Sequence, residues 1–306
     1  ASSSSPRMTE PFRCSWASRQ REDSMIATAP PARRWLLIER EGPWPRRALD
    51  VFEPDAAREV ADRAHALGAR ISLIRRPARH PRTPGPFQWA IADVRPGREG
   101  IRWHVADYLN ELVRHPWEVD PGEGKPVALV CCHSKHDVCC ALRGRPVAAA
   151  LDLLWPGRVW ECSHLGGDRF AATAVLLPHG LCYGRLDPEV AAVTLKAYEQ
   201  DLVLPEHLRG RSSYSRHVQA AQALVRQAGF GNDALDALRP VHVRALGDAV
   251  TEVDLSHPDV RIRFREREVP LGTPATCHAA KPGNGMEYET LSVDHLRSSD
   301  STIPSG

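Results

Sequence analysis

PVALVCCHSKHDVCCALRGRPVAAALDLL, residues 126–154, joins a short apolar run to a longer amphipathic one. Residues 126–130 predict a buried strand, and residues 141–154 predict a helix whose first turn begins near Cys139. A loop that leaves a parallel strand and enters a helix lies at the carboxyl edge of an α/β sheet, where such folds place binding sites. Because a helix N-terminus favours thiolate over thiol, this segment predicts an α/β fold with sulfur ligands at a strand end.

Four cysteines fall within ten residues of this segment, as the adjacent pairs Cys131-Cys132 and Cys139-Cys140. We interpret one cysteine of each pair as an ordinary small core residue, because neighbouring side chains rarely face the same way. The remaining two thiols are then expected to point into the same loop. A pair of converging thiols predicts a metal site or a redox site.

A second segment, Trp160-Glu-Cys-Ser-His-Leu-Gly-Gly-Asp-Arg-Phe170, precedes the apolar run 171–178. Cys162, His164 and Asp168 offer sulfur, nitrogen and oxygen ligands around a Gly-Gly turn. A structural interpretation is equally open at this point: His164 caps the turn and Asp168 pairs with Arg169 or another cation.

Composition restricts the class of protein. The 306 residues include 40 Lys and Arg against 38 Asp and Glu, so a net charge of +2 gives no reason to expect a nucleic-acid or membrane partner. No run approaches the roughly 18 apolar residues that span a bilayer, and we expect a cytoplasmic protein. In that reducing compartment the eight cysteines favour metal ligands or redox-active thiols over disulfides.

The chain divides into five predicted regions with an α/β (α+β) pattern. In residues 34–120 we expect strands at 35–39, 71–74 and 87–94 and helices at 56–67 and 101–113. In residues 121–206 we expect further strands at 171–178 and 181–186, and a helix that begins after Asp187 and ends near 202. The two halves resemble each other in element order, which suggests a structural repeat. The other regions are a flexible arm (1–33), a C-terminal α+β extension (207–280) with a helix at 215–228 and strands at 241–246 and 260–266, and a mostly disordered tail (281–306).

Several motifs together resemble one known family. They are Cys131-x-His133-x-x-x-Asp137-x-x-Cys140, Gly144-Arg-Pro146, His164-Leu-Gly-Gly-Asp-Arg-Phe170 and Pro178-His-Gly180. From Cys14 to about Cys277 the chain resembles the sucrase/ferredoxin-like family, whose members carry a thioredoxin-like ferredoxin domain. The resemblance places that domain at residues 121–206.

The resemblance implies a [2Fe-2S] cluster held by a Cys-x8-Cys pair, which matches Cys131 and Cys140, and by two ligands from the Gly-Gly turn. In some relatives that turn reads His-x-Gly-Gly-His; here the first histidine is His164 and the second position holds Asp168. A carboxylate is a hard, uncommon ligand for such iron, and Cys162 is the natural substitute. The expected ligands are therefore Cys131, Cys140, Cys162 and His164, with Asp168 as the alternative to Cys162.

We expect an electron carrier or redox sensor rather than a catalyst, with a redox protein partner, either a reductase or an electron acceptor. A structural zinc site is a second hypothesis, although zinc ligands usually come in closer Cys-x2-4-Cys pairs. A thioredoxin-like thiol redox enzyme is a third, although the chain contains no Cys-x-x-Cys motif. Five arginines could form a basic rim for an acidic partner: Arg143, Arg145, Arg169, Arg209 and Arg211.

Overall fold

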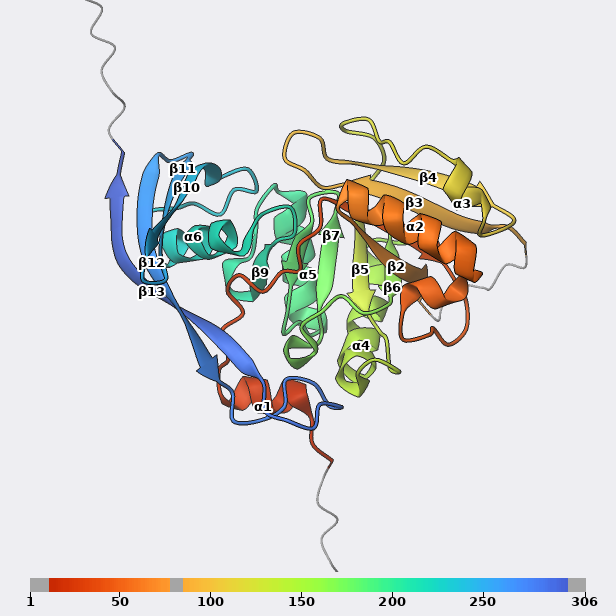
Figure 1. Cartoon of the computed structure of the whole chain (residues 1–306), viewed down its shortest axis with the longest axis horizontal. Coiled ribbons are helices and arrows are strands. Elements are labelled where there is room, and N and C mark those ends of the chain that lie inside the picture. The colour runs from red at the N-terminus through yellow and green to blue at the C-terminus, as the bar shows by residue number, and fades with distance from the viewer. Residues whose placement is uncertain (1–10, 78–84, 297–306) are drawn as a thin grey trace, which may run out of the picture.

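The computed structural model describes residues 11–77 and 85–296. A nine-stranded mixed sheet fills the centre, and a separate four-stranded antiparallel sheet lies to one side (Figure 1). The predicted α/β fold class is confirmed. The helices are α1 (Cys14–Gln20), α2 (Pro54–Leu67), α3 (Glu111–Arg114), α4 (Val138–Leu154), α5 (Pro188–Glu199) and α6 (Arg216–Gln227), with 3₁₀ helices η1 (Ala48–Val51), η2 (Asp168–Phe170) and η3 (Pro205–His207).

The nine-stranded sheet contains the same four-stranded arrangement twice. Its strands are β1 (Arg34–Glu39), β2 (Ala69–Arg75), β3 (Phe87–Asp93), β4 (Gly100–Ala106), β5 (Val127–Cys131), β6 (Val159–Cys162), β7 (Ala174–Leu177), β8 (Leu181–Tyr183) and β9 (Leu208–Arg211). The first half has the strand order β4-β3-β1-β2, and the second half, taken in the opposite direction across the sheet, has the matching order β8-β7-β5-β6. In each half the first two strands in sequence are parallel: β1 with β2, and β5 with β6. The predicted likeness of the two halves is confirmed by this shared topology. None of the eight cysteines lies in residues 34–120.

The two halves join edge to edge, where β2 pairs antiparallel with β6. Helix α4 packs Val147 and Leu151 against alternate residues of β5 such as Val130. The residues between them, Leu129 and Cys131, face the other side of the sheet and share one core with Trp35 and Leu37 of β1. Both faces of the central strands are therefore buried, and their nearly continuous apolar sequence follows from that burial.

The predicted helix over residues 101–113 is wrong. Residues Gly100–Ala106 form β4, which pairs with β3 along its whole length, and a single helical turn, α3, follows it. The run Ile101-Arg-Trp-His-Val105 is rich in β-branched and aromatic residues, which fit a pleated surface. Pairing with a neighbouring strand therefore outweighs the weak helical periodicity of this segment.

The described residues of the predicted arm and tail are more ordered than predicted. Within the arm 1–33, residues 14–20 form α1, and Cys14 and Ser18 are fully buried; residues 1–10 lie outside the described part. Within the tail 281–306, β13 (Asn284–His295) pairs antiparallel with β12 (Val260–Pro270); residues 297–306 lie outside the described part. Strands β10 (Arg239–Gly247) and β11 (Val250–Ser256) complete this sheet, on which α6 packs. The β12–β13 hairpin reaches across to α1 (Figure 1).

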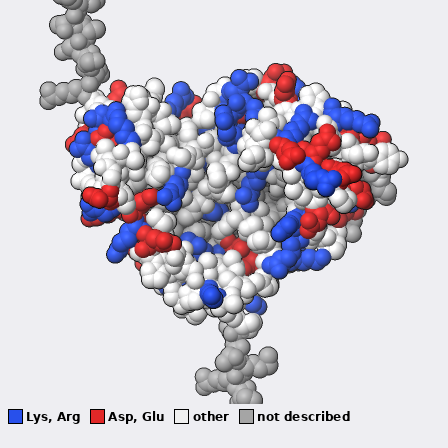
Figure 2. Space-filling view, viewed as in Figure 1, with Lys and Arg blue, Asp and Glu red and all other residues white. Residues whose placement is uncertain are grey.

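The predicted basic rim is not formed by all five arginines. Arg209 and Arg211 are buried, and Arg169 is partly buried beside Asp23, whereas Arg143 and Arg145 are exposed. On the face shown in Figure 2, basic and acidic residues are interspersed. No helix within residues 11–77 and 85–296 has the length and apolar character that crossing a membrane requires.

Candidate metal centre

Three of the predicted ligands meet at one edge of the large sheet. Cys131 ends β5, Cys140 lies in the first turn of α4, and His164 follows β6. One ligand atom from each lies within 4.8 Å of the other two. Because β5 and β6 are parallel, their carboxyl ends bring these segments to the same edge, as the sequence predicts.

The two thiols of this group are buried and differ in their acidity. Contact with Cys140 and His164 holds the pKa of Cys131 well below its ordinary value, although burial acts in the opposite direction. The pKa of Cys140 is raised, first by its contact with Cys131 and then by burial. Of the two thiols, Cys131 therefore loses its proton more readily, and thiolate is the form that binds metal.

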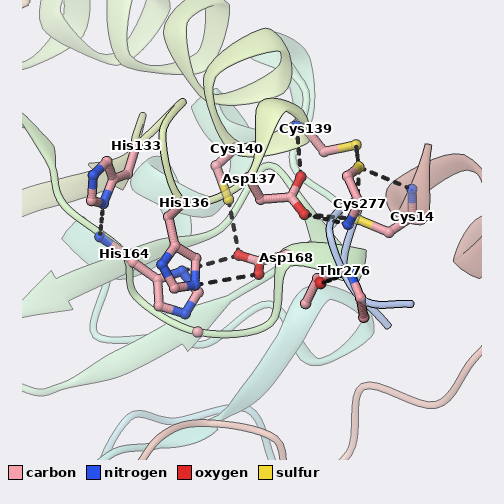
Figure 3. Close-up of polar contacts among 12 residues, drawn as sticks. Cys14, His133, His136, Asp137, Cys139, Cys140, His164, Asp168, Thr276 and Cys277 are labelled. Atoms are coloured by element: carbon pink, nitrogen blue, oxygen red, sulfur yellow. Dashed lines mark hydrogen bonds and ion pairs between the residues drawn. The ribbon is translucent and has the colours of Figure 1, made fainter. Parts of the chain in front are cut away.

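Asp168 contacts two of these three residues, Cys140 and His164. Its Oδ1 accepts a hydrogen bond from the Cys140 thiol at 3.1 Å and lies 3.0 Å from Nδ1 of His164 (Figure 3). Burial opposes ionisation of Asp168, but the hydrogen bond from His164 lowers its pKa overall. Burial would likewise lower the pKa of His164, yet the hydrogen bonds to Asp168 and Cys131 raise it to about 9. His164 is therefore protonated at neutral pH without a metal and must lose a proton to bind one.

Cys162 lies beside the group but outside it. Its backbone is paired with that of Cys131 across β5 and β6, and its side chain is fully buried in the core that both halves share. Burial raises the pKa of its thiol well above the ordinary value. The structure thus brings together Cys131, Cys140 and His164, with Asp168 in contact with Cys140 and His164, and with Cys162 outside the group.

His136 is a further donor that the sequence analysis missed. Its ring stacks on that of His164 with centroids 3.5 Å apart, and its Nε2 lies 3.8 Å from Oδ2 of Asp168. Its buried Nδ1 has no hydrogen-bond partner among the described residues. Its position in the loop between Cys131 and Cys140 is the feature of the sequence from which it could have been predicted as a donor.

The loops that carry the ligands are held from several sides. Gly167 has a φ of 80°, and a Cβ there would meet the guanidinium group of the buried Arg209. Arg209 in turn donates to the carbonyl oxygen of Gly166 at 2.9 Å and to Thr28 Oγ1 at 3.1 Å. The Gly-Gly turn therefore needs glycine both for its backbone conformation and for space.

The N-terminal half also supports the site. Arg70 of β2 donates to the carbonyl oxygen of His164 at 3.0 Å, and the backbone amide of Leu73 donates to Ser163 Oγ at 3.0 Å. Trp44 lies edge-on to His133, with ring centroids 5.8 Å apart. The cysteine-free half thus contacts both segments that carry ligands.

A second group of donors lies on the other side of the first turn of α4. It consists of Cys14, Asp137, Cys139 and Cys277, whose ligand atoms also lie within 4.8 Å of one another. Figure 3 shows Cys139 pointing toward Cys277 and Cys140 pointing toward Asp168. Of the two adjacent pairs, Cys132 packs in the core as expected, but Cys139 belongs to this second group.

The two groups could each hold a metal ion, since the first combines sulfur and nitrogen donors and the second combines sulfur and oxygen donors at short range. The sequence profile of the sucrase/ferredoxin-like family matches residues 25–210, which is more than half of the chain. No curated protein and no solved structure matches the chain. Together with the motifs around Cys131 and the Gly-Gly turn, the profile match identifies the chain as a member of the sucrase/ferredoxin-like family.

Proposed function

We propose that this protein binds a [2Fe-2S] cluster through Cys131, Cys140, His164 and Asp168 and serves in one-electron transfer or redox sensing. The observation that carries the proposal is the convergence of Cys131, Cys140 and His164 within 4.8 Å at the carboxyl ends of β5 and β6. Two cysteines and a histidine are ligands that iron-sulfur clusters accept.

Asp168 is proposed as the fourth ligand because of where it lies relative to the other ligands. Asp168 contacts both Cys140 and His164, whereas Cys162, which is paired with Cys131, belongs to none of the donor groups. His136, whose buried Nδ1 has no hydrogen-bond partner among the described residues, is a further candidate because it groups with His164 and Asp168. Asp168 also occupies the position of the second histidine in the family motif, and this agreement favours it over His136.

The cluster, when bound, would supply a one-electron couple with a higher potential than an all-cysteine cluster, because imidazole is neutral. The side chains of His164 and His136 are 24% and 29% exposed, whereas Cys131 and Cys140 are buried. A redox partner would therefore approach over the two histidines. His164 carries the titratable nitrogen that can couple proton uptake to reduction.

The proposal is tested by anaerobic purification with iron, acid-labile sulfide and zinc quantified per chain. We expect about two irons and matching sulfide in the wild type, and loss of both in Cys131→Ser, Cys140→Ser and His164→Ala. Asp168→Ala should lose or destabilise the cluster, whereas Cys162→Ser should keep it. Cys182→Ser is the control, because Cys182 is buried in the same core but outside both donor groups.

The outcomes separate the alternatives. Cluster loss in Cys162→Ser but not in Asp168→Ala would return the fourth position to Cys162. Cluster loss in His136→Ala but not in Asp168→Ala would assign it to His136. Zinc without sulfide, lost in Cys131→Ser, would replace the iron-sulfur proposal with a zinc site, which the same compact donor set also suits.

A further inference from the structure

We propose that Cys14, Asp137, Cys139 and Cys277 form a second, independent metal site that binds one structural Zn²⁺. The site joins three segments that are distant in sequence: α1, the first turn of α4, and the loop between β12 and β13. It does not depend on the nature of the cofactor at the first site, because the two groups share no residue.

The distances between the donors suit a tetrahedral ion. The Cys277 sulfur lies 3.4 Å from that of Cys139 and 3.6 Å from that of Cys14, and the Cys14 sulfur lies 3.5 Å from Asp137 Oδ2. Zinc-sulfur bonds of about 2.3 Å at tetrahedral angles separate two sulfurs by about 3.8 Å, and a sulfur and an oxygen by about 3.6 Å. Small movements of a few tenths of an ångström would complete the site.

The donors are already oriented by backbone groups. Asp137 is the N-cap of α4: its Oδ1 accepts from the amide of Cys139 at 2.8 Å, and its Oδ2 accepts from the amide of Cys277 at 2.6 Å. The amide of Cys14 lies 3.5 Å from the Cys277 sulfur and can donate to it. Such outer contacts fix ligand orientation in metal sites, and each carboxylate oxygen keeps a lone pair for the ion.

Burial and connectivity favour a structural role. Cys14, Asp137 and Cys139 are almost completely buried, and Cys277 is partly buried. Helix α1 has 7 residues, too few for a helix to be stable without tertiary contacts. Zinc bound by all three segments would hold α1 and the hairpin loop on α4, with the thiol protons released to solvent. A groove of about 1000 Å³ lies beside the site, since Cys139, Arg13 and Thr273 help to line it.

Zinc content per chain, measured on the intact protein after anaerobic purification and incubation with Zn²⁺, tests the proposal. We expect one zinc in the wild type that is lost in Cys277→Ser and Cys14→Ser and retained in Cys182→Ser. Cys277 lies in a partly exposed loop, so its variant is expected to fold even if that of Cys14 does not. The double variant Cys131→Ser/Cys140→Ser should keep this zinc, which separates it from metal at the first site.

Cobalt provides a second readout. Co²⁺ bound to the wild type should show the visible bands of a tetrahedral thiolate complex. Asp137→Asn, which preserves the helix cap, should change these bands because one ligand is replaced. Equal zinc in wild type and Cys277→Ser, or no zinc in the wild type, would overturn the proposal. A Cys139–Cys277 disulfide in the freshly purified protein, seen by mass spectrometry without zinc, would also overturn it.

Discussion

Gly144 controls how closely α4 approaches β5, and Gly144→Ala should displace a predicted ligand. A Cβ at this position would lie 2.1 Å from the carbonyl oxygen of Cys131 and 3.1 Å from the Cys132 sulfur. Ordinary contact begins near 3.4 Å, so the helix must move by about 1.3 Å relative to the strand. Cys140 lies one turn earlier on the same helix and would move with it.

Two opposing energies decide the sign of the effect on stability. Alanine favours a helix over glycine by about 1 kcal/mol, whereas overpacking a core costs about 1–3 kcal/mol. The contact is with backbone, which cannot rotate away, so we expect the upper part of that range and a net loss of about 2 kcal/mol. A ligand shift of about 1.3 Å also exceeds the tolerance of about 0.2 Å in metal-ligand distances.

Two measurements check this prediction: metal content after anaerobic purification, and the midpoint of thermal unfolding of the metal-free protein. The matched control is Gly157→Ala, where φ is +74° and nothing lies within 4 Å of the added Cβ. The control should lose about 1–2 kcal/mol from backbone strain but keep its metal. A Gly144→Ala protein with full metal content and unchanged or raised thermal stability would refute the packing argument.

Three further predictions concern the site and its support. If His164 binds the cluster, reduction raises the pKa of its imidazole, so the potential should fall as pH rises, by up to about 59 mV per unit. A potential that is constant between about pH 6 and 9 would argue against histidine ligation. Arg209→Lys should destabilise the protein by about 2–3 kcal/mol in chemical denaturation, because lysine cannot reproduce the contacts to Gly166 and Thr28, whereas the exposed Arg216→Lys should have little effect. Cys132→Ala should cost about 1 kcal/mol and leave the metal content unchanged, and metal loss there would show that Cys132 is more than a core residue.

Much of the fold could be predicted because its signals are local. Asp187 caps α5 through its side chain, with Pro188 at the first helical position, as the sequence predicts. Gly68 ends α2 in a left-handed conformation. These signals involve residues within a few positions of one another, so they do not depend on which other elements pack nearby.

The wrong predictions concern segments whose structure depends on pairing with residues that are distant in the sequence. Strand β4 exists because β3 is available to pair with it, and β13 exists because β12 is. Cys162, which the sequence predicts as a ligand, lies beside Cys131 on the same face of the sheet but outside the group of Cys131, Cys140 and His164, so its role as a ligand stays a prediction. No spacing rule connects Cys14 with Cys277, which are 263 residues apart, so their meeting at Asp137 is visible only in three dimensions.

The neighbouring cysteines at the start of α4 have a wider consequence for counting metals from sequence. An α-helix turns by about 100° per residue, so two consecutive side chains on its first turn cannot serve one small ion from the same side. Cys139 and Cys140 accordingly face different donor groups. The two cysteines of a Cys-Cys pair at the start of a helix are therefore better assigned to two separate sites than to one ligand set.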